Sequence, residues 1–326
     1  ACCSGATTAR RRCTICATNL DPMAANRPLA GIAFGLIAYG IWGFFPLYFH
    51  QLSGISPMDI LSNRAVWAFV FVGILLTLRQ RWGTALAVFR TPRYIIMLAL
   101  AALLVGSNWL MFLWAVAHQQ VVASSFGYFL TPLVNVLLGL VVLKERLNRL
   151  EWISVALAVA AIVNEVITLG SLPWISLFLA ATFGTYGLVR KQVPVDAISG
   201  LWLETLVMLP ICGIYALWQA QSGHFVFGDF FRLTAGPANN GMVAALLVGS
   251  GILTALPLMA FAAATQRLDL ATVGMLMYIN PTLQFLTAVF IFNEPMQTGR
   301  LISFALIWLG LFVFSASLWR KYRQPS

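Results

Sequence analysis

Charged residues are scarce in this chain. Asp, Glu, Lys and Arg make up 9% of its 326 residues, whereas a soluble domain carries roughly 25%. A soluble fold of this length needs a charged surface that this composition does not supply. The chain also contains no His-Glu-x-x-His, no Gly-x-Ser-x-Gly and no Gly-x-x-x-x-Gly-Lys-Ser/Thr, and only three histidines. We therefore predict no enzyme activity, no cofactor, no metal and no direct use of ATP.

Ten apolar runs fill most of the sequence. Each is about as long as the helix of roughly 20 residues that crosses a hydrocarbon core of about 30 Å. Backbone polar groups in lipid must pair within the segment, and these runs are too continuous for alternating barrel strands. The sequence therefore predicts an all-α membrane protein with ten transmembrane helices. The predicted spans are 28–51, 60–78, 94–117, 121–143, 151–169, 173–190, 199–218, 241–265, 271–292 and 299–319.

Basic residues are distributed unevenly around these runs. Seventeen of the 20 lie before the first span, in every second gap or after the last span, and the opposite gaps contain only Arg232. Cytoplasmic loops are enriched in Lys and Arg, which predicts that both termini are cytoplasmic in a multi-pass inner (plasma) membrane protein. Anionic lipid beside the basic loops and the tail 320–326 accounts for the net charge of +10 without a nucleic-acid partner.

The first 22 residues differ in composition from the rest of the chain. They precede Met23, lack an apolar run and contain four of the five cysteines: Cys2, Cys3, Cys13 and Cys16. A single Cys-x-x-Cys pair is a weak signal for a metal site. We therefore interpret residues 1–22 as a non-native or disordered extension.

The two halves of the chain repeat. The hexapeptide Ala102-Leu103-Leu104-Val105-Gly106-Ser107 recurs letter for letter as residues 245–250, and further matches share an offset of 149 residues. Those matches are Pro132 with Pro281, Asn135 with Gln284 and Glu145 with Glu294. A unit of five spans is odd, so the second copy is inserted in the opposite orientation, as in many transporters. We predict two inverted five-helix repeats, 28–169 and 173–319.

Several motifs resemble a known family. They include Tyr39-Gly40-Ile41-Trp42-Gly43, Gly127-Tyr128-Phe129, Pro132-Leu133-Val134-Asn135 and Tyr186-Gly187-Leu188-Val189-Arg190-Lys191. On these motifs the chain resembles the EamA branch of the drug/metabolite transporter superfamily, over about Leu29 to Trp319, and within it the RarD-type chloramphenicol-sensitivity permeases. The resemblance implies a secondary transporter that exports small metabolites or drugs, such as chloramphenicol-like compounds, by alternating access. One departure is Asn63, where the family often has His.

Two other functional classes stay open from the residues alone. A channel normally shows a pore loop or rings of charge, and an intramembrane enzyme needs a nucleophile with a base or a metal triad. Neither pattern occurs in this sequence. Membrane lipid and a small-molecule substrate are the expected partners, and no pattern predicts the oligomeric state.

Polar and aromatic residues near the middle of the spans are the candidates for a substrate cavity. An amide at that depth must find a partner or face water. Three amides together with aromatics from both halves fit a cavity better than isolated helix clamps do. The cavity candidates are Trp42, Arg64, Asn108, Trp109, Asn135, Tyr186, Glu204, Tyr278 and Gln284.

Arg64 and Glu204 are the charged members of this set. A charge inside the membrane costs about 2.5 kcal/mol or more, so such residues usually have a function. We expect both side chains to face a shared aqueous cavity and to bind a zwitterionic or polar substrate. The alternatives for Arg64 are snorkelling to the interface and an ion pair with Glu165.

Two prolines occupy matching positions in the two halves. Pro132 and Pro281 each fall in the middle of a predicted span. Proline removes a backbone donor and bends a helix. We predict that this pair forms the hinges of alternating access, with fixed kinks as the alternative.

Overall fold

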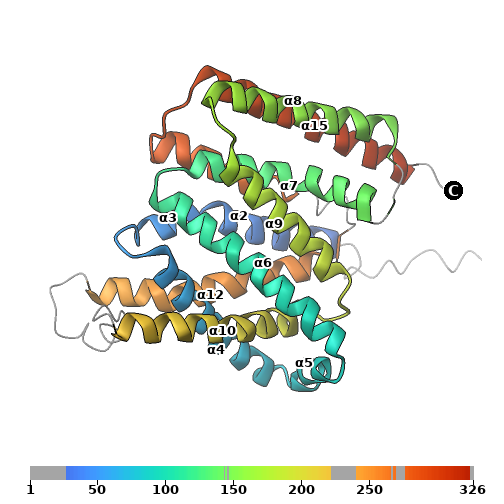
Figure 1. The fold of residues 1–326 in the computed structure, drawn as a ribbon. Coiled ribbons are helices and arrows are strands. Elements are labelled where there is room, and N and C mark those ends of the chain that lie inside the picture. The colour runs from blue at the N-terminus through green and yellow to red at the C-terminus, as the bar shows by residue number, and fades with distance from the viewer. Residues whose placement is uncertain are drawn as a thin grey trace, which may run out of the picture.

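The computed structural model confirms the all-helical fold class. It describes residues 27–142, 144, 147–221, 240–265, 267–268 and 276–323. Within these ranges the regular structure is helical, and eight helices are long and apolar enough to cross a membrane (Figure 1). The predicted extension 1–22 with its cysteines, and Glu145, lie outside the described residues.

The helices follow one another in chain order with short connections. They are α2 (Arg27–Gly43), α3 (Phe45–His50), α4 (Pro57–Leu78), α5 (Trp82–Ala87), η1 (Val88–Arg90), α6 (Pro92–Ala117), α7 (Val121–Val142), α8 (Arg149–Leu169), α9 (Trp174–Lys191), α10 (Ala197–Gln221), α12 (Asn240–Thr265), α14 (Ile279–Leu286), η2 (Thr287–Ile291) and α15 (Thr298–Arg323).

Most predicted spans correspond to one of these helices. The sixth, 173–190, is α9, which is not among the eight most apolar helices. The ninth, 271–292, is represented by a shorter apolar helix over Ile279–Ile291. The helix α15 continues to Arg323, so most of the predicted tail 320–326 is helical.

Local sequence signals explain where several helices begin and end. Ser56 accepts a hydrogen bond from the backbone amide of Met58, and Pro57 occupies the first position of α4. Asn148 and Glu151 form a reciprocal capping box at the start of α8. At its other end, Gly170 adopts a φ of 65°, the left-handed conformation that glycine adopts at little cost.

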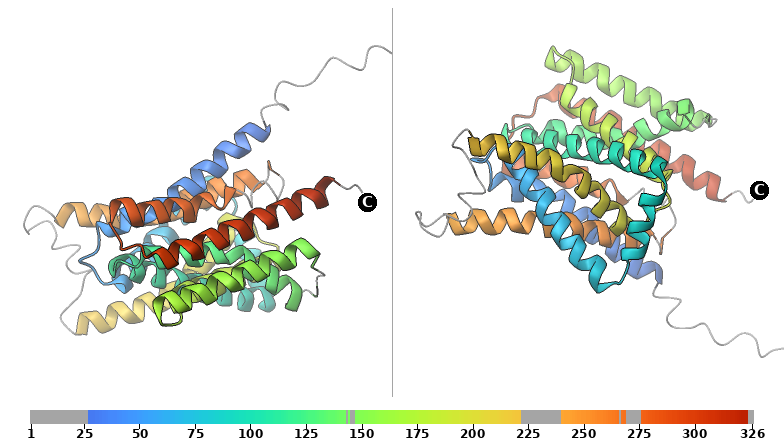
Figure 2. Two further views of the ribbon diagram at one scale, coloured as in Figure 1. Left: turned by 90° about the horizontal axis from the view of Figure 1, so that it is seen from above. Right: turned by 60° about the horizontal axis from the view of Figure 1, so that its bottom comes forward.

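The helices of the two halves interleave. The helix α2 packs against α12 and α14, and α9 packs against α6 and α7. The helix α4 lies between α12 and α10 (Figure 2). A buried core cluster contains residues from both halves, including Phe126, Phe285 and Phe304.

The helices α8 and α15 form a pair at one edge of the bundle (Figures 1 and 2). Near the start of α8, Asn148 donates to Ser317, and near its end Asn164 donates to Ser303. The two helices are therefore antiparallel. A Cβ at Gly299 would overlap the side chain of Thr168, so glycine permits the close approach of these helices.

Large apolar side chains point outward along several helices. Ile167, Phe290 and Phe312 are each more than 70% exposed. In a membrane protein such side chains contact lipid tails, which are as apolar as leucine. This outer surface agrees with a lipid environment.

Candidate substrate site

Arg64 is buried at a junction of helices from both halves. Its side chain extends from α4 and is 2% exposed. Its Nε donates a hydrogen bond of 2.7 Å to the hydroxyl of Thr254 on α12. The guanidinium carbon lies 4.1 Å from the ring centre of Trp109 and 5.3 Å from those of Phe45 and Phe49. Arg64 therefore does not snorkel to the interface.

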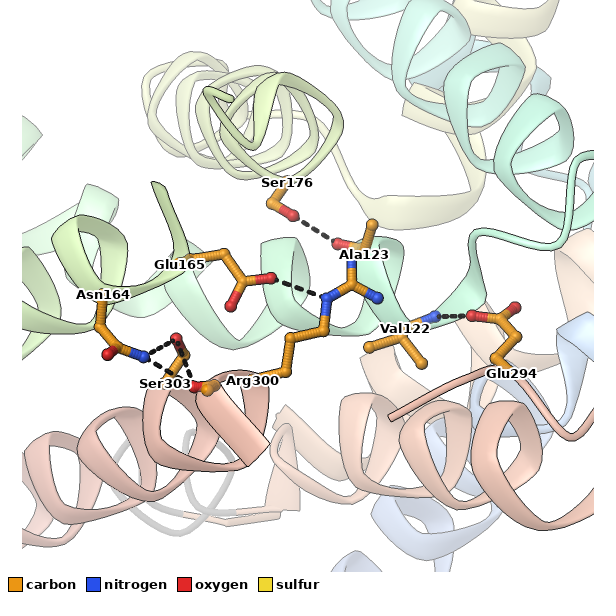
Figure 3. A network of polar contacts seen from close by, with 9 residues as sticks. Val122, Ala123, Asn164, Glu165, Ser176, Glu294, Arg300 and Ser303 are labelled. Atoms are coloured by element: carbon orange, nitrogen blue, oxygen red, sulfur yellow. Dashed lines mark hydrogen bonds and ion pairs between the residues drawn. The ribbon is translucent and has the colours of Figure 1, made fainter. Parts of the chain in front are cut away.

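The predicted ion pair between Arg64 and Glu165 is wrong. Glu165 instead pairs with Arg300, whose Nε lies 3.1 Å from its Oε1 (Figure 3). Depth counted along ideal helices placed Arg64 and Glu165 at one height but could not show which helices are neighbours. In the structure α8 packs against α15, so its acidic residue meets a base on that helix.

Glu204 also has partners of its own. It lies on α10 and is 1% exposed. Its Oε1 is 3.2 Å from Nε of Arg190, and the hydroxyl of Tyr186 donates to its Oε2 at 3.2 Å. A Cβ at Gly200 would overlap the guanidinium of Arg190, so glycine makes room for this ion pair. The cavity that Glu204 and Arg64 are predicted to share stays a prediction, because both side chains are buried in this conformation.

Asn108 joins three helices. Its Nδ2 on α6 donates to the carbonyl of Leu179 at 3.0 Å and to the hydroxyl of Thr182 at 2.9 Å, both on α9. The hydroxyl of Tyr128 on α7 donates to its Oδ1 at 3.0 Å. All these groups are buried or partly buried, so Asn108 is a polar clamp between helices.

Gln284 connects α14 with the break between α2 and α3. Proline has no backbone N–H, so Pro46 cannot donate to the carbonyl of Trp42 four residues earlier. That carbonyl accepts a long hydrogen bond of 3.4 Å from Nε2 of Gln284, which also donates to Asn280 at 2.9 Å. The Oε1 of Gln284 is buried and has no partner among the described residues.

The remaining candidates are less buried. Trp42 lies in an aromatic group with Tyr39 and Phe261, with ring centres 5.6–6.1 Å apart. Tyr278 is half-buried beside this region, and Asn135 is exposed on α7. The structure therefore places the nine candidates in several small groups and brings Arg64 together with Trp109, and Tyr186 with Glu204.

The two hinge candidates differ in their local structure. Pro132 lies inside α7, as predicted. Pro281 is the third residue of α14, so its predicted position in the middle of a helix is wrong. The first amides of a helix have no intrahelical acceptor, so proline removes no bond there. The carbonyl of Pro281 accepts a hydrogen bond of 2.8 Å from Ser125 on α7, which connects the two segments.

Glu294 is a residue whose role the sequence did not reveal. Its carboxylate accepts hydrogen bonds from the amides of Val121 and Val122, at 2.6 Å and 2.8 Å (Figure 3). It thus caps α7, where the helix dipole favours a negative charge. Burial raises the pKa of the Glu294 carboxyl, and these two hydrogen bonds act in the opposite direction. The repeat match with Glu145 marked the residue, but no local pattern indicated a contact across more than 170 positions.

Metal binding has no support among the residues that the structure describes. They contain no group of three His, Cys, Asp or Glu side chains that could hold an ion. Cys13 and Cys16 lie outside the described residues, and Cys212 is a buried free thiol on α10.

Comparisons with known proteins identify the family. The profile of the EamA-like transporter family matches residues 29–164. An uncharacterized transporter of Vibrio cholerae is 42% identical over 87% of this chain and 91% of its own length. Protein RarD of Escherichia coli is 39% identical over 90% of this chain and 96% of its own. The chloramphenicol-sensitive protein RarD of Pseudomonas aeruginosa is 30% identical over 89% of this chain and 96% of its own.

One solved crystal structure shares the fold. It covers 92% of this chain and 99% of its own, with a TM-score of 0.54 and 20% sequence identity. The identity to the curated relatives extends along nearly their whole length and includes both halves of the helical bundle. The chain therefore belongs to the EamA-like transporter family and is a RarD-type multi-pass membrane transporter.

Proposed function

We propose that this protein is a secondary transporter that exports small metabolites or drugs across the inner membrane by alternating access. The observation that carries the proposal is a buried contact between the halves, in which Arg64 of the first half donates to Thr254 of the second. Transporters of inverted-repeat architecture hold their substrates near the bilayer midplane, between the repeats. Thr254 lies near the middle of α12, which fits that depth.

Reciprocal packing supports two inverted repeats over 28–169 and 173–319. If the sixth span repeats the first, α9 corresponds to α2 and α12 to α6. The contact of α6 with α9 then has its counterpart in the contact of α12 with α2. The antiparallel pair of α8 and α15 joins the last spans of the two repeats.

The distribution of basic residues supports cytoplasmic termini. In this orientation α7 begins on the periplasmic side, where Glu294 caps it. The rings of His50 and Phe292 stack nearby, with centres 4.5 Å apart. These contacts would close the periplasmic side, and bending at Pro132 would help to open it. We therefore regard the Glu294 cap as part of a periplasmic gate.

Export and saturation test the proposal. Cells that overexpress the protein should accumulate less of at least one compound from a panel of metabolites and drugs, including chloramphenicol, than cells lacking it. Purified protein in liposomes should transport that compound with saturable kinetics, which distinguishes a carrier from a channel. No difference in accumulation for any compound would contradict export, and flux that rises linearly with concentration would support a channel.

A further inference from the structure

The guanidinium of Arg64 lacks a negative partner in the part of the chain that the structure describes. The two ion pairs found there join Arg190 with Glu204 and Arg300 with Glu165. Arg64 is nevertheless the most deeply buried of these three arginines, since the side chains of the other two are each 16% exposed. Burying an ionised group without a counter-charge is strongly unfavourable.

The neighbours of Arg64 satisfy it only in part. Thr254 is a neutral acceptor and occupies Nε. The Nη1 nitrogen is buried and has no hydrogen-bond partner among the described residues. The rings of Trp109, Phe45 and Phe49 stabilise the cation through their faces, but rings do not replace a hydrogen-bonding anion. A guanidinium presents donors in a fixed fork that matches the two oxygens of a carboxylate.

Resting on the proposed function, we infer that Arg64 is the binding site for the anionic group of the transported substrate, and that this substrate is a small carboxylate with an apolar or aromatic body. The fork of the guanidinium would hold the carboxylate. The ring of Trp109, 4.1 Å from the guanidinium, would provide a flat surface for the body of the molecule. Glu204 is excluded from this role, because it is negative and already has Arg190 and Tyr186 as partners.

The inference differs from a purely structural role for Arg64 in one measurable respect. A structural arginine would support the fold whatever compound is added. A substrate-binding arginine makes binding depend on the charge of the compound. Chloramphenicol carries no carboxylate, so it serves as an uncharged comparison.

Thermal unfolding of the purified full-length protein tests the inference directly. The probes are phenylacetate, indole-3-acetate and octanoate, each compared with its uncharged amide. We expect at least one carboxylate to raise the Tm of the wild-type protein while its amide does not, because a ligand stabilises the state that binds it. Arg64→Gln should weaken the apparent affinity for that carboxylate at least tenfold, and Arg64→Lys should restore part of it. Arg300→Gln is the matched control, since it removes a buried charge elsewhere and should leave the affinity unchanged.

Three results would overturn the inference. They are stabilisation by no carboxylate, equal stabilisation by acids and amides, and unchanged affinity in Arg64→Gln. If Arg64→Gln fails to accumulate in the membrane, the comparison of acids with amides on the wild-type protein decides the question. Export of the same probes, with chloramphenicol, separates this inference from the proposed function. Export of uncharged compounds alone would leave the transporter standing and reject the anion site, whereas export of nothing would reject the transporter.

Discussion

The carboxylate of Glu294 lies 2.6 Å from the backbone amide of Val121, a residue 173 positions earlier in the chain. Its second oxygen accepts from the next amide, that of Val122. The first turn of a helix leaves four amides without intrahelical acceptors, and one side chain satisfies two of them here. The start of α7 is thus fixed by a loop of the other half of the protein.

Removing this cap should destabilise the protein. Glu294→Ala leaves two partly buried amides without acceptors, and we expect a loss of about 1–3 kcal/mol in unfolding free energy. Glu294→Gln keeps one neutral acceptor oxygen and should lose less. Thermal unfolding of the purified variants in detergent measures both effects. An alanine variant as stable as the glutamine variant would show that the cap contributes little.

The pair of Glu204 and Arg190 should show energetic coupling. Glu204→Gln leaves a largely buried guanidinium without its counter-charge, which destabilises more than removal of both charges. We therefore expect Glu204→Gln with Arg190→Gln to be at least as stable as Glu204→Gln alone. A double-mutant cycle on thermal unfolding measures the coupling. Additive effects would mean that the 3.2 Å contact contributes no stability.

Export should be lost in Glu204→Gln even where the protein accumulates normally. The variant keeps the shape of the side chain and removes its charge, which changes the buried contact with Tyr186 as well. We expect most export of the compound identified in cells to disappear at a membrane level near that of the wild type. Normal export would remove Glu204 from the set of functional residues.

Asn108 and Asn135 should behave differently when each is replaced by alanine. Asn108 has three hydrogen-bond partners on two other helices, whereas Asn135 is exposed. Interhelical hydrogen bonds in membranes contribute about 0.6 kcal/mol each on average, so Asn108→Ala should cost about 1–2 kcal/mol. Asn135→Ala should leave stability nearly unchanged. Equal losses in thermal unfolding would contradict this assignment.

Two glycines provide a matched test of helix packing. A Cβ at Gly251 on α12 would overlap the backbone of Trp67 on α4, whereas a Cβ at Gly213 on α10 would meet nothing within 4 Å. Gly251→Ala must therefore separate two helices, and we expect a loss of about 1–3 kcal/mol. Gly213→Ala should be neutral or stabilise by up to about 1 kcal/mol, because alanine favours helix. Membrane levels and thermal unfolding of the two variants check the contrast.

The features that follow from composition and periodicity were predictable from the sequence. Apolar runs of bilayer length fix where helices occur, and the helical fold class is confirmed. The choice of partners was not predictable, because it depends on which helices are neighbours and how each is rotated. Glu165 illustrates this point: its depth was predicted, but it pairs with Arg300 because α8 packs against α15.

Local chain geometry was the second limit. Pro281 and Pro132 match in the aligned halves, yet only Pro132 lies inside a long helix. The break at Pro46 also escaped a span prediction based on hydrophobicity, since proline interrupts the backbone without changing the apolar character of the run. Its consequence, a free carbonyl at Trp42 for Gln284, requires the fold.

The pairing of α8 with α15 sets an order of events during synthesis. Glu165 enters the membrane well before Arg300, which is 135 residues further along the chain. At about 5–20 residues per second, the ribosome needs about 7 to 27 seconds to supply that partner. During this interval α8 must wait with its acidic group neutralised by a proton or shielded by an insertion factor. A nascent chain arrested before Thr298 should therefore crosslink to insertion machinery through α8, and a chain released after Arg323 should not.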